Sequence, residues 1–188
     1  MRYHTFFGVK ELSRINALRE VEDGLFVALQ HHVHFDNNGY PQRAQGWDLR
    51  MFSRIVTVSD YYDAMTSPRV YQEPVSAVHA LHFILTKSGQ IFDPLIAKAF
   101  IGTMGIFPIG TLVELDSGES GVVVRQHESM RYLRRPFVAL ADVDGIDADA
   151  APIDLTMRSD KGYMRSIVRD IHGEKAEQLR RAFFVEES

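Results

Sequence analysis

The chain has 188 residues, of which 45% are apolar, a formal net charge of −4 at pH 7 and no cysteine. This length fits one large domain or two small ones, and the apolar content excludes wholesale disorder. The mild charge does not favour nucleic acid or an anionic membrane as a partner, and the lack of cysteine excludes disulfides and thiolate chemistry. No apolar run has membrane-spanning length and no signal peptide is recognised, so we expect a cytoplasmic protein that does not insert into membranes.

Helical periodicity dominates the first hundred residues. The helices predicted from it cover about residues 4–14, 18–34, 45–66, 76–87 and 93–102. Asp93 is expected to cap the last of these helices, with Pro94 at its first position. Between the second and third helices, Gly39 and Pro41 oppose helix continuation, so a loop is expected there.

The pattern changes to extended structure after Pro108. Residues 111–115, a turn at 116–121 and residues 122–125 predict a β-hairpin, and strands are further expected at 136–141, 153–156 and 166–168. Residues 174–184 predict a short closing helix. The expected fold class is α+β: a portion of an α-helical bundle over residues 1–106, then a small β-rich domain over 107–188 that forms an SH3-like barrel or a bent sheet.

Three features of the helical part could carry chemistry. His31 and His32 end the second predicted helix, Asp60 lies late in an apolar helix, and His4 lies in the first helix. Neighbouring helical residues point about 100° apart, so both adjacent imidazoles reach one pocket only if it is wide, as a two-metal site is. Imidazole and carboxylate without thiolate suit Fe, Mn, Zn, Co or Ni.

Each of these residues also has a purely structural interpretation. His4 near a terminus fits a surface position, and the adjacent histidines, with His34 beside them, fit a solvated helix end. Asp60 could instead pair with Arg54 or Arg69. Taken singly, each residue favours the structural interpretation, whereas their joint spacing favours a metal site.

The joint spacing resembles a known family. The run His31-His32-x-x-x-Asp36-x-x-Gly39-Tyr40-Pro41 resembles the signature of the HD-GYP phosphodiesterases. Three other segments are similar to that family: His4-x-x-x-Gly8-x-x-x-Leu12, Ser59-Asp60-x-x-Asp63-Ala64-Met65-Thr66-Ser67-x-Arg69-x-Tyr71 and Ser88-Gly89-x-x-Phe92-Asp93-Pro94. The resemblance covers residues 4–105, and the β-rich part resembles a tail found after some members.

The resemblance implies a bacterial signalling hydrolase. The family hydrolyses cyclic di-GMP with two or three divalent metals, such as iron or manganese, held in a helical bundle. The metal ligands implied here are His4, His31, His32 and Asp60. The tripeptide Gly39, Tyr40 and Pro41, called the GYP segment below, is implied to bind substrate and to recruit a signalling protein partner, and Arg69 to contact a phosphate or guanine.

Departures from the family pattern bear on activity. The namesake His-Asp pair, and a second His-Asp motif followed by Gly and Lys, precede the segment that matches His4. With three residues before His4, we expect neither motif to be present. We therefore expect no intact catalytic set, and a chain that is inactive or incomplete unless a dimer or a complementing chain supplies the rest. Val33, Asn37 and Gln72 replace residues that are usually acidic, glycine and basic.

Two other functions remain open at this point. The chain could be a non-catalytic signalling module that binds a protein partner or a cyclic dinucleotide through the GYP segment. It could also be a nucleic-acid adaptor acting through Arg131, Arg134 and Arg135, although the net negative charge argues against nucleic acid as a partner.

Overall fold

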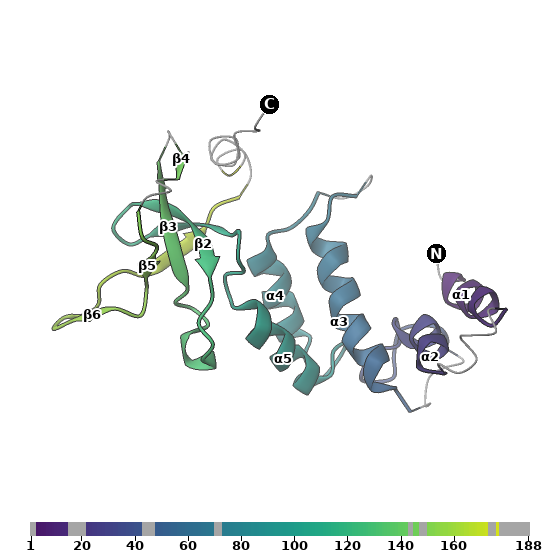
Figure 1. Ribbon diagram of the computed structural model, residues 1–188. Helices are drawn as coiled ribbons and strands as arrows, with labels where there is room; N and C mark the ends of the chain where they lie inside the picture. The colour runs from purple at the N-terminus through teal and green to yellow at the C-terminus, as the bar shows by residue number, and fades with distance from the viewer. Residues whose placement is uncertain are drawn as a thin grey trace. The chain divides into compact units, whose positions relative to one another are not determined.

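The computed structural model describes residues 3–14, 22–42, 48–69, 73–142, 145–146, 150–172 and 176. The chain divides into two compact units, one formed by Met1–Val75 and Ala80–Phe100 and the other by Ser76–His79 and Ile101–Ser188. Helices make up the first unit and an antiparallel sheet dominates the second (Figure 1), which confirms the α+β fold class. The domain boundary expected after residue 106 stays a prediction.

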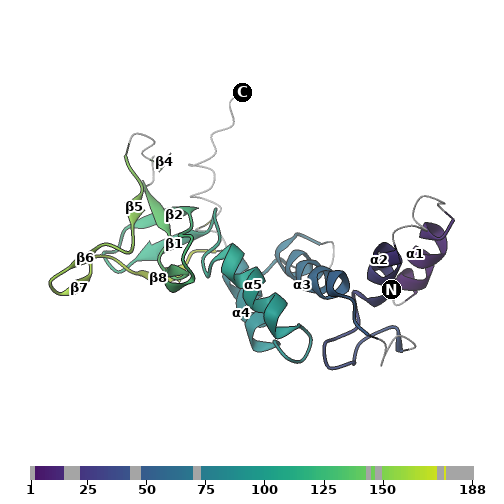
Figure 2. The ribbon, with the colours of Figure 1, turned by 60° about the horizontal axis from the view of Figure 1, so that its bottom comes forward.

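The helices occupy the regions that the periodicity predicts. They are α1 (His4–Leu12), α2 (Glu22–Gln30), α3 (Met51–Thr66), α4 (Ala77–Thr86) and α5 (Pro94–Met104). In the helical unit α1 packs against α2, and α2 against α3 (Figures 1 and 2). The first contact is close because Gly8 faces Ala28: a Cβ added at Gly8 would lie 3.7 Å from the Ala28 Cβ. No described helix is long and apolar enough to cross a membrane.

The second helix ends earlier than expected, at Gln30 instead of His34. The chain leaves the helix because Val33 N–H bonds to the Gln30 carbonyl at 2.8 Å, and Val33 then pairs with Gly39 across an isolated bridge. His31 therefore lies in a turn, together with His32, and the 100° separation of helical neighbours does not apply to them. The expected start of this helix falls outside the described residues.

A buried amide joins the end of α2 to the beginning of α3. Gln30 is fully buried, and its Nε2 donates to the Asp48 carbonyl at 3.2 Å. Its Oε1 accepts from Arg50 N–H at 3.2 Å and from the Ser53 hydroxyl at 3.0 Å. The stretch before α3 is extended at Arg50, so α3 begins at Met51 and not near residue 45 as expected.

The start of α5 is capped as predicted. The Asp93 carboxylate accepts from Leu95 N–H at 2.8 Å, and Pro94 occupies the first helical position. The other carboxylate oxygen of Asp93 accepts from Arg54 of α3 at 3.0 Å. Arg54 also donates to the Leu49 carbonyl at 2.8 Å, so one guanidinium ties the cap of α5 to the beginning of α3.

The second unit contains a curved antiparallel sheet of order β4-β3-β2-β1-β8, in which β5 also pairs with β3. The strands are β1 (Leu112–Leu115), β2 (Ser120–Arg125), β3 (Phe137–Asp142), β4 (Gly145–Ile146), β5 (Ile153–Asp154) and β8 (Ile167–Asp170). Register shifts interrupt the β1–β8 and β2–β3 pairings, and such irregularities bend strands. A separate hairpin, β6 (Arg158–Ser159) with β7 (Gly162–Tyr163), projects from this sheet (Figure 2).

Both faces of the sheet carry apolar residues. Successive side chains of a strand point to opposite faces, so Leu112 of β1 joins one core cluster while Val113 and Leu115 join another. The predicted hairpin is confirmed by the antiparallel pairing of β1 with β2, and the bent sheet is the form observed. The closing helix expected at 174–184 lies outside the described residues, except for Ala176, which is helical and buried.

Removing the buried amide should destabilise the helical unit. Gln30→Met keeps the length of the side chain but leaves Arg50 N–H and the Ser53 hydroxyl without their acceptor. We expect the free energy of unfolding to fall by about 2 kcal/mol, measured by urea titration of circular dichroism. Gln90→Met is the matched control because Gln90 is exposed, and a similar loss there would contradict the assignment.

Candidate metal centre

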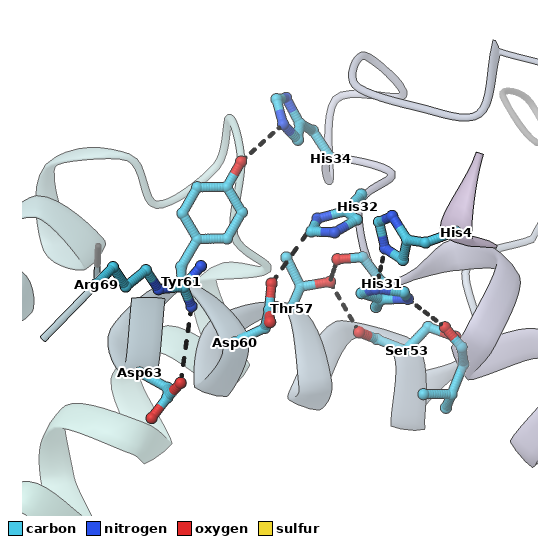
Figure 3. A network of polar contacts seen from close by, with 11 residues as sticks. His4, His31, His32, His34, Ser53, Thr57, Asp60, Tyr61, Asp63 and Arg69 are labelled. Carbon is cyan, nitrogen blue, oxygen red and sulfur yellow. Dashed lines mark hydrogen bonds and ion pairs between the residues drawn. The ribbon is translucent and has the colours of Figure 1, made fainter. Parts of the chain in front are cut away.

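Three imidazole rings from two parts of the chain converge in the helical unit (Figure 3). His4 is the first residue of α1, and His31 and His32 form the turn after α2. His4 Nε2 lies 3.3 Å from His31 Nε2, and the ring centroids of His31 and His32 are 4.2 Å apart. One ring nitrogen from each histidine lies within 4.8 Å of the other two, so this cluster could hold a metal ion.

The orientation of His31 is set by a backbone contact. Its Nδ1 lies 2.8 Å from the Val27 carbonyl, so Nδ1 carries the proton and donates it. Nε2 faces His4 and carries the lone pair of the neutral imidazole. Metal-binding histidines commonly have their other ring nitrogen fixed in this way.

The turn that carries the histidines is attached to α3. The buried Thr57 hydroxyl lies 2.9 Å from the His31 carbonyl and 2.8 Å from the Ser53 carbonyl of the preceding helical turn. Together with the Gln30 amide, this contact holds residues 30 and 31 of the turn against one face of α3. Asp60 lies one turn further along the same face (Figure 3).

His32 lies between an aromatic ring and a carboxylate. Its ring centroid is 4.5 Å from that of Tyr40, and its Nδ1 is 3.8 Å from Asp60 Oδ2. Burial lowers the pKa of His32 to about 4, and His31 adds to the effect, while Asp60 opposes it. His32 is therefore neutral at pH 7 and offers a lone pair, as a metal ligand must.

The donor set fits a divalent transition metal. Imidazole nitrogens suit Zn, Fe, Ni or Cu, and a nearby carboxylate extends the range to Mn. Asp60 lies beside the Nδ1 of His32, which is the arrangement of a carboxylate that orients a ligand imidazole. Its own role as a fourth ligand stays a prediction.

The GYP segment folds back onto the histidines. Tyr40 N–H donates to the His32 carbonyl at 3.1 Å, and the Tyr40 ring centroid also lies 6.2 Å from that of His4. Gly39 has a φ of 87°, and a Cβ at this position would collide with the His32 carbonyl. Only glycine permits this close return of the chain.

Arg69 belongs to a different neighbourhood from the histidines. Its guanidinium lies 3.8 Å from Asp63 Oδ2, and both side chains are exposed (Figure 3). Arg54 pairs with Asp93, so in the described part of the chain neither arginine pairs with Asp60, contrary to the structural interpretation above. The predicted substrate role of Arg69 remains untested.

Sequence reasoning did not select Thr57 or Tyr61. Thr57 holds the His31 carbonyl, and the Tyr61 hydroxyl lies 3.3 Å from His34 Nε2. Burial raises the pKa of Tyr61, with smaller contributions from Tyr40 and Asp60, so the phenol stays protonated at neutral pH. The available signal was position: Thr57 and Tyr61 lie one helical turn apart and flank Asp60.

The family model described as the HD domain matches residues 1–96, just over half of the chain. The chain belongs to the HD domain family. The matched region contains the whole histidine cluster, Asp60, the GYP segment and Arg69.

The HD domain of this chain is homologous to bacterial phosphodiesterases. A cyclic di-GMP phosphodiesterase of Pseudomonas aeruginosa is 40% identical over 101 residues, which is 54% of this chain and 24% of that protein. One of Thermotoga maritima is 35% identical over 101 residues, 54% of this chain and 27% of that protein. A 3'3'-cGAMP-specific phosphodiesterase of Vibrio cholerae is 29% identical over 101 residues, 54% and 19% respectively. The chain thus spans about a quarter of the length of these relatives.

Removing a central imidazole should abolish tight metal binding. Even a partner outside the coordination shell is worth 10–100-fold in affinity, so His31→Ala is expected to weaken Mn²⁺ binding by about 100-fold or more. Isothermal titration calorimetry of the full chain measures the effect. His82→Ala on the exposed face of α4 is the control, and equal affinities for the two variants would contradict the assignment.

Proposed function

We propose that residues 1–106 carry part of the site of a metal-dependent cyclic di-GMP phosphodiesterase. The observation that supports this most directly is the convergence of His4, His31 and His32 within one matched HD domain. The names of the relatives supply the substrate class, since those proteins are phosphodiesterases of cyclic dinucleotides. The β-rich unit is given no chemistry in this proposal.

Each part of the site would have a defined task. A bound divalent metal supplies water activation and neutralises charge on the phosphodiester. His4, His31 and His32 hold the metal, and Asp60 completes or orients this ligand set. The GYP segment lines the substrate side, where the Tyr40 ring offers an aromatic face beside His32.

Arg69 is proposed to bind a phosphate of the dinucleotide. Its guanidinium is half exposed and only loosely paired with Asp63 at 3.8 Å, so it can exchange partners at small cost. A planar guanidinium binds phosphate with two parallel hydrogen bonds. Arg69 lies three residues beyond the end of α3, the helix that carries Asp60.

The ligand set is proposed to be incomplete within these 188 residues. Three imidazoles and one carboxylate make an open shell for one metal, whereas in-line displacement on a phosphodiester is best served by two. The remaining ligands would come from a longer chain, a dimer partner or a complementing chain. Catalysis by the chain alone is accordingly not expected.

A second candidate is a non-catalytic module that binds a cyclic dinucleotide or a signalling protein through the GYP segment. It is favoured by Val33, which stands where the family usually has an acidic residue. Val33 is 2% exposed and packs with Leu29 and Leu49. No carboxylate is therefore offered to the metal centre from this position.

Cyclic di-GMP is expected to bind the Mn²⁺-loaded chain through Arg69. Arg69→Ala should weaken dinucleotide binding by about 10-fold, because a charge-assisted hydrogen bond contributes about 1.5–3 kcal/mol. The affinity for Mn²⁺ should remain unchanged. Calorimetry measures both affinities, and Arg131→Ala in the β-rich unit is the control.

The same titration separates the two candidates. A metal-centred site would be contradicted if the chain still bound the dinucleotide after chelation of the metal. It would equally be contradicted if the His31→Ala variant still bound it. Product analysis by chromatography gives the second readout: turnover of cyclic di-GMP by the chain alone would exclude the non-catalytic module.

A further inference from the structure

The position of Tyr40 depends on the loop that carries it. The loop 33–41 leaves the histidine turn, reverses at Asn37 and returns to place Tyr40 against His32. Its internal contacts include the bridge between Val33 and Gly39, the bond from His34 N–H to the Asn38 carbonyl at 2.9 Å and the bond from Asn37 N–H to the His34 carbonyl at 2.9 Å. These contacts shape the loop but do not fix it to the rest of the helical unit.

Backbone bonds attach the tip of the loop to the turn that precedes α5. Phe35 N–H donates to the Ile91 carbonyl at 3.0 Å, and Asp36 N–H donates to the Gln90 carbonyl at 2.9 Å. The strand that returns through Tyr40 is joined to the histidine turn by the bond from Tyr40 N–H to the His32 carbonyl at 3.1 Å. The His34 ring packs against this strand, since a Cβ at Gly39 would lie 2.9 Å from His34 Cδ2.

A side-chain contact attaches the loop to α3. His34 Nε2 lies 3.3 Å from the Tyr61 hydroxyl, and Tyr61 directly follows Asp60 in α3 (Figure 3). The Tyr61 ring is held in place by aromatic neighbours, with ring centroids 5.2 Å from Phe92 and 6.4 Å from Phe83. The phenol is thus a rigid anchor that faces the loop.

We propose that Tyr61 is a positioning residue, whose hydroxyl holds His34 and thereby keeps Tyr40 seated against His32. The inference rests on the proposed metal site, because Tyr40 then closes one side of the histidine cluster. Tyr61 makes two kinds of contact from its position beside Asp60. Its ring packs into the aromatic group while its hydroxyl reaches the loop.

Tyr61→Phe removes the hydroxyl and keeps the ring in its packing. In the metal-free chain, we expect the NMR signals of the Tyr40 ring protons to shift toward those of an unstacked tyrosine. Comparison with Tyr40→Phe assigns these signals. Because partners outside the coordination shell affect metal affinity, we also expect the dissociation constant for Mn²⁺ to rise by about 3- to 10-fold.

Tyr62→Phe is the matched control. Tyr62 is the next residue of α3, is also half-buried, and packs against Phe100 with ring centroids 5.3 Å apart. We expect Tyr62→Phe to change neither the Tyr40 signals nor the affinity for Mn²⁺. Equal effects of the two variants would show a general loss of packing and overturn the proposal.

A double-mutant cycle tests whether His34 is the partner. His34→Ala and Tyr61→Phe should each move the Tyr40 signals, and the double variant should move them no further. Additive effects, or unchanged Tyr40 signals in Tyr61→Phe, would overturn the proposal. Failure of the unmodified chain to bind Mn²⁺ would contradict the proposed function instead, since the Tyr40 signals are read without metal.

Discussion

The buried contacts between the turn 30–32 and α3 govern the rest of the site. The Gln30 amide binds groups on both sides of the start of α3, and Thr57 holds the His31 carbonyl. Unpaired polar groups at these buried positions would be costly, so the turn has one favoured placement. That placement orients His31 toward His4 and brings His32 beside Asp60.

Two properties of the cluster follow from this single constraint. Burial and the neighbouring His31 imidazole disfavour the protonated form of His32 and lower its pKa. The cluster also directs lone pairs at a common point, so a divalent cation is the ligand that the geometry suits best. The loop 33–41 then places Tyr40 against His32, while Val33 packs with Leu29 and Leu49.

The sequence predicted the helices and the hairpin, because apolar periodicity is a local signal, and its motif spacing selected the three histidines that the structure brings together. It misplaced the end of α2, since the turn after Gln30 is stabilised by partners from residues 48 to 53. The strands β4, β6 and β7 have two residues each and are too short to show alternation. Partners such as Asp63 for Arg69, and Tyr61 for His34, depend on packing between segments and leave no periodic signal.

We infer that His4, His31 and His32 bind one metal ion together. X-ray absorption spectroscopy of the full chain loaded with one equivalent of Zn²⁺ tests this most directly, because bound imidazole rings give a distinctive scattering pattern. We expect three imidazole nitrogens at about 2.0–2.1 Å from the zinc. A spectrum with one imidazole, or with oxygen ligands alone, would contradict it.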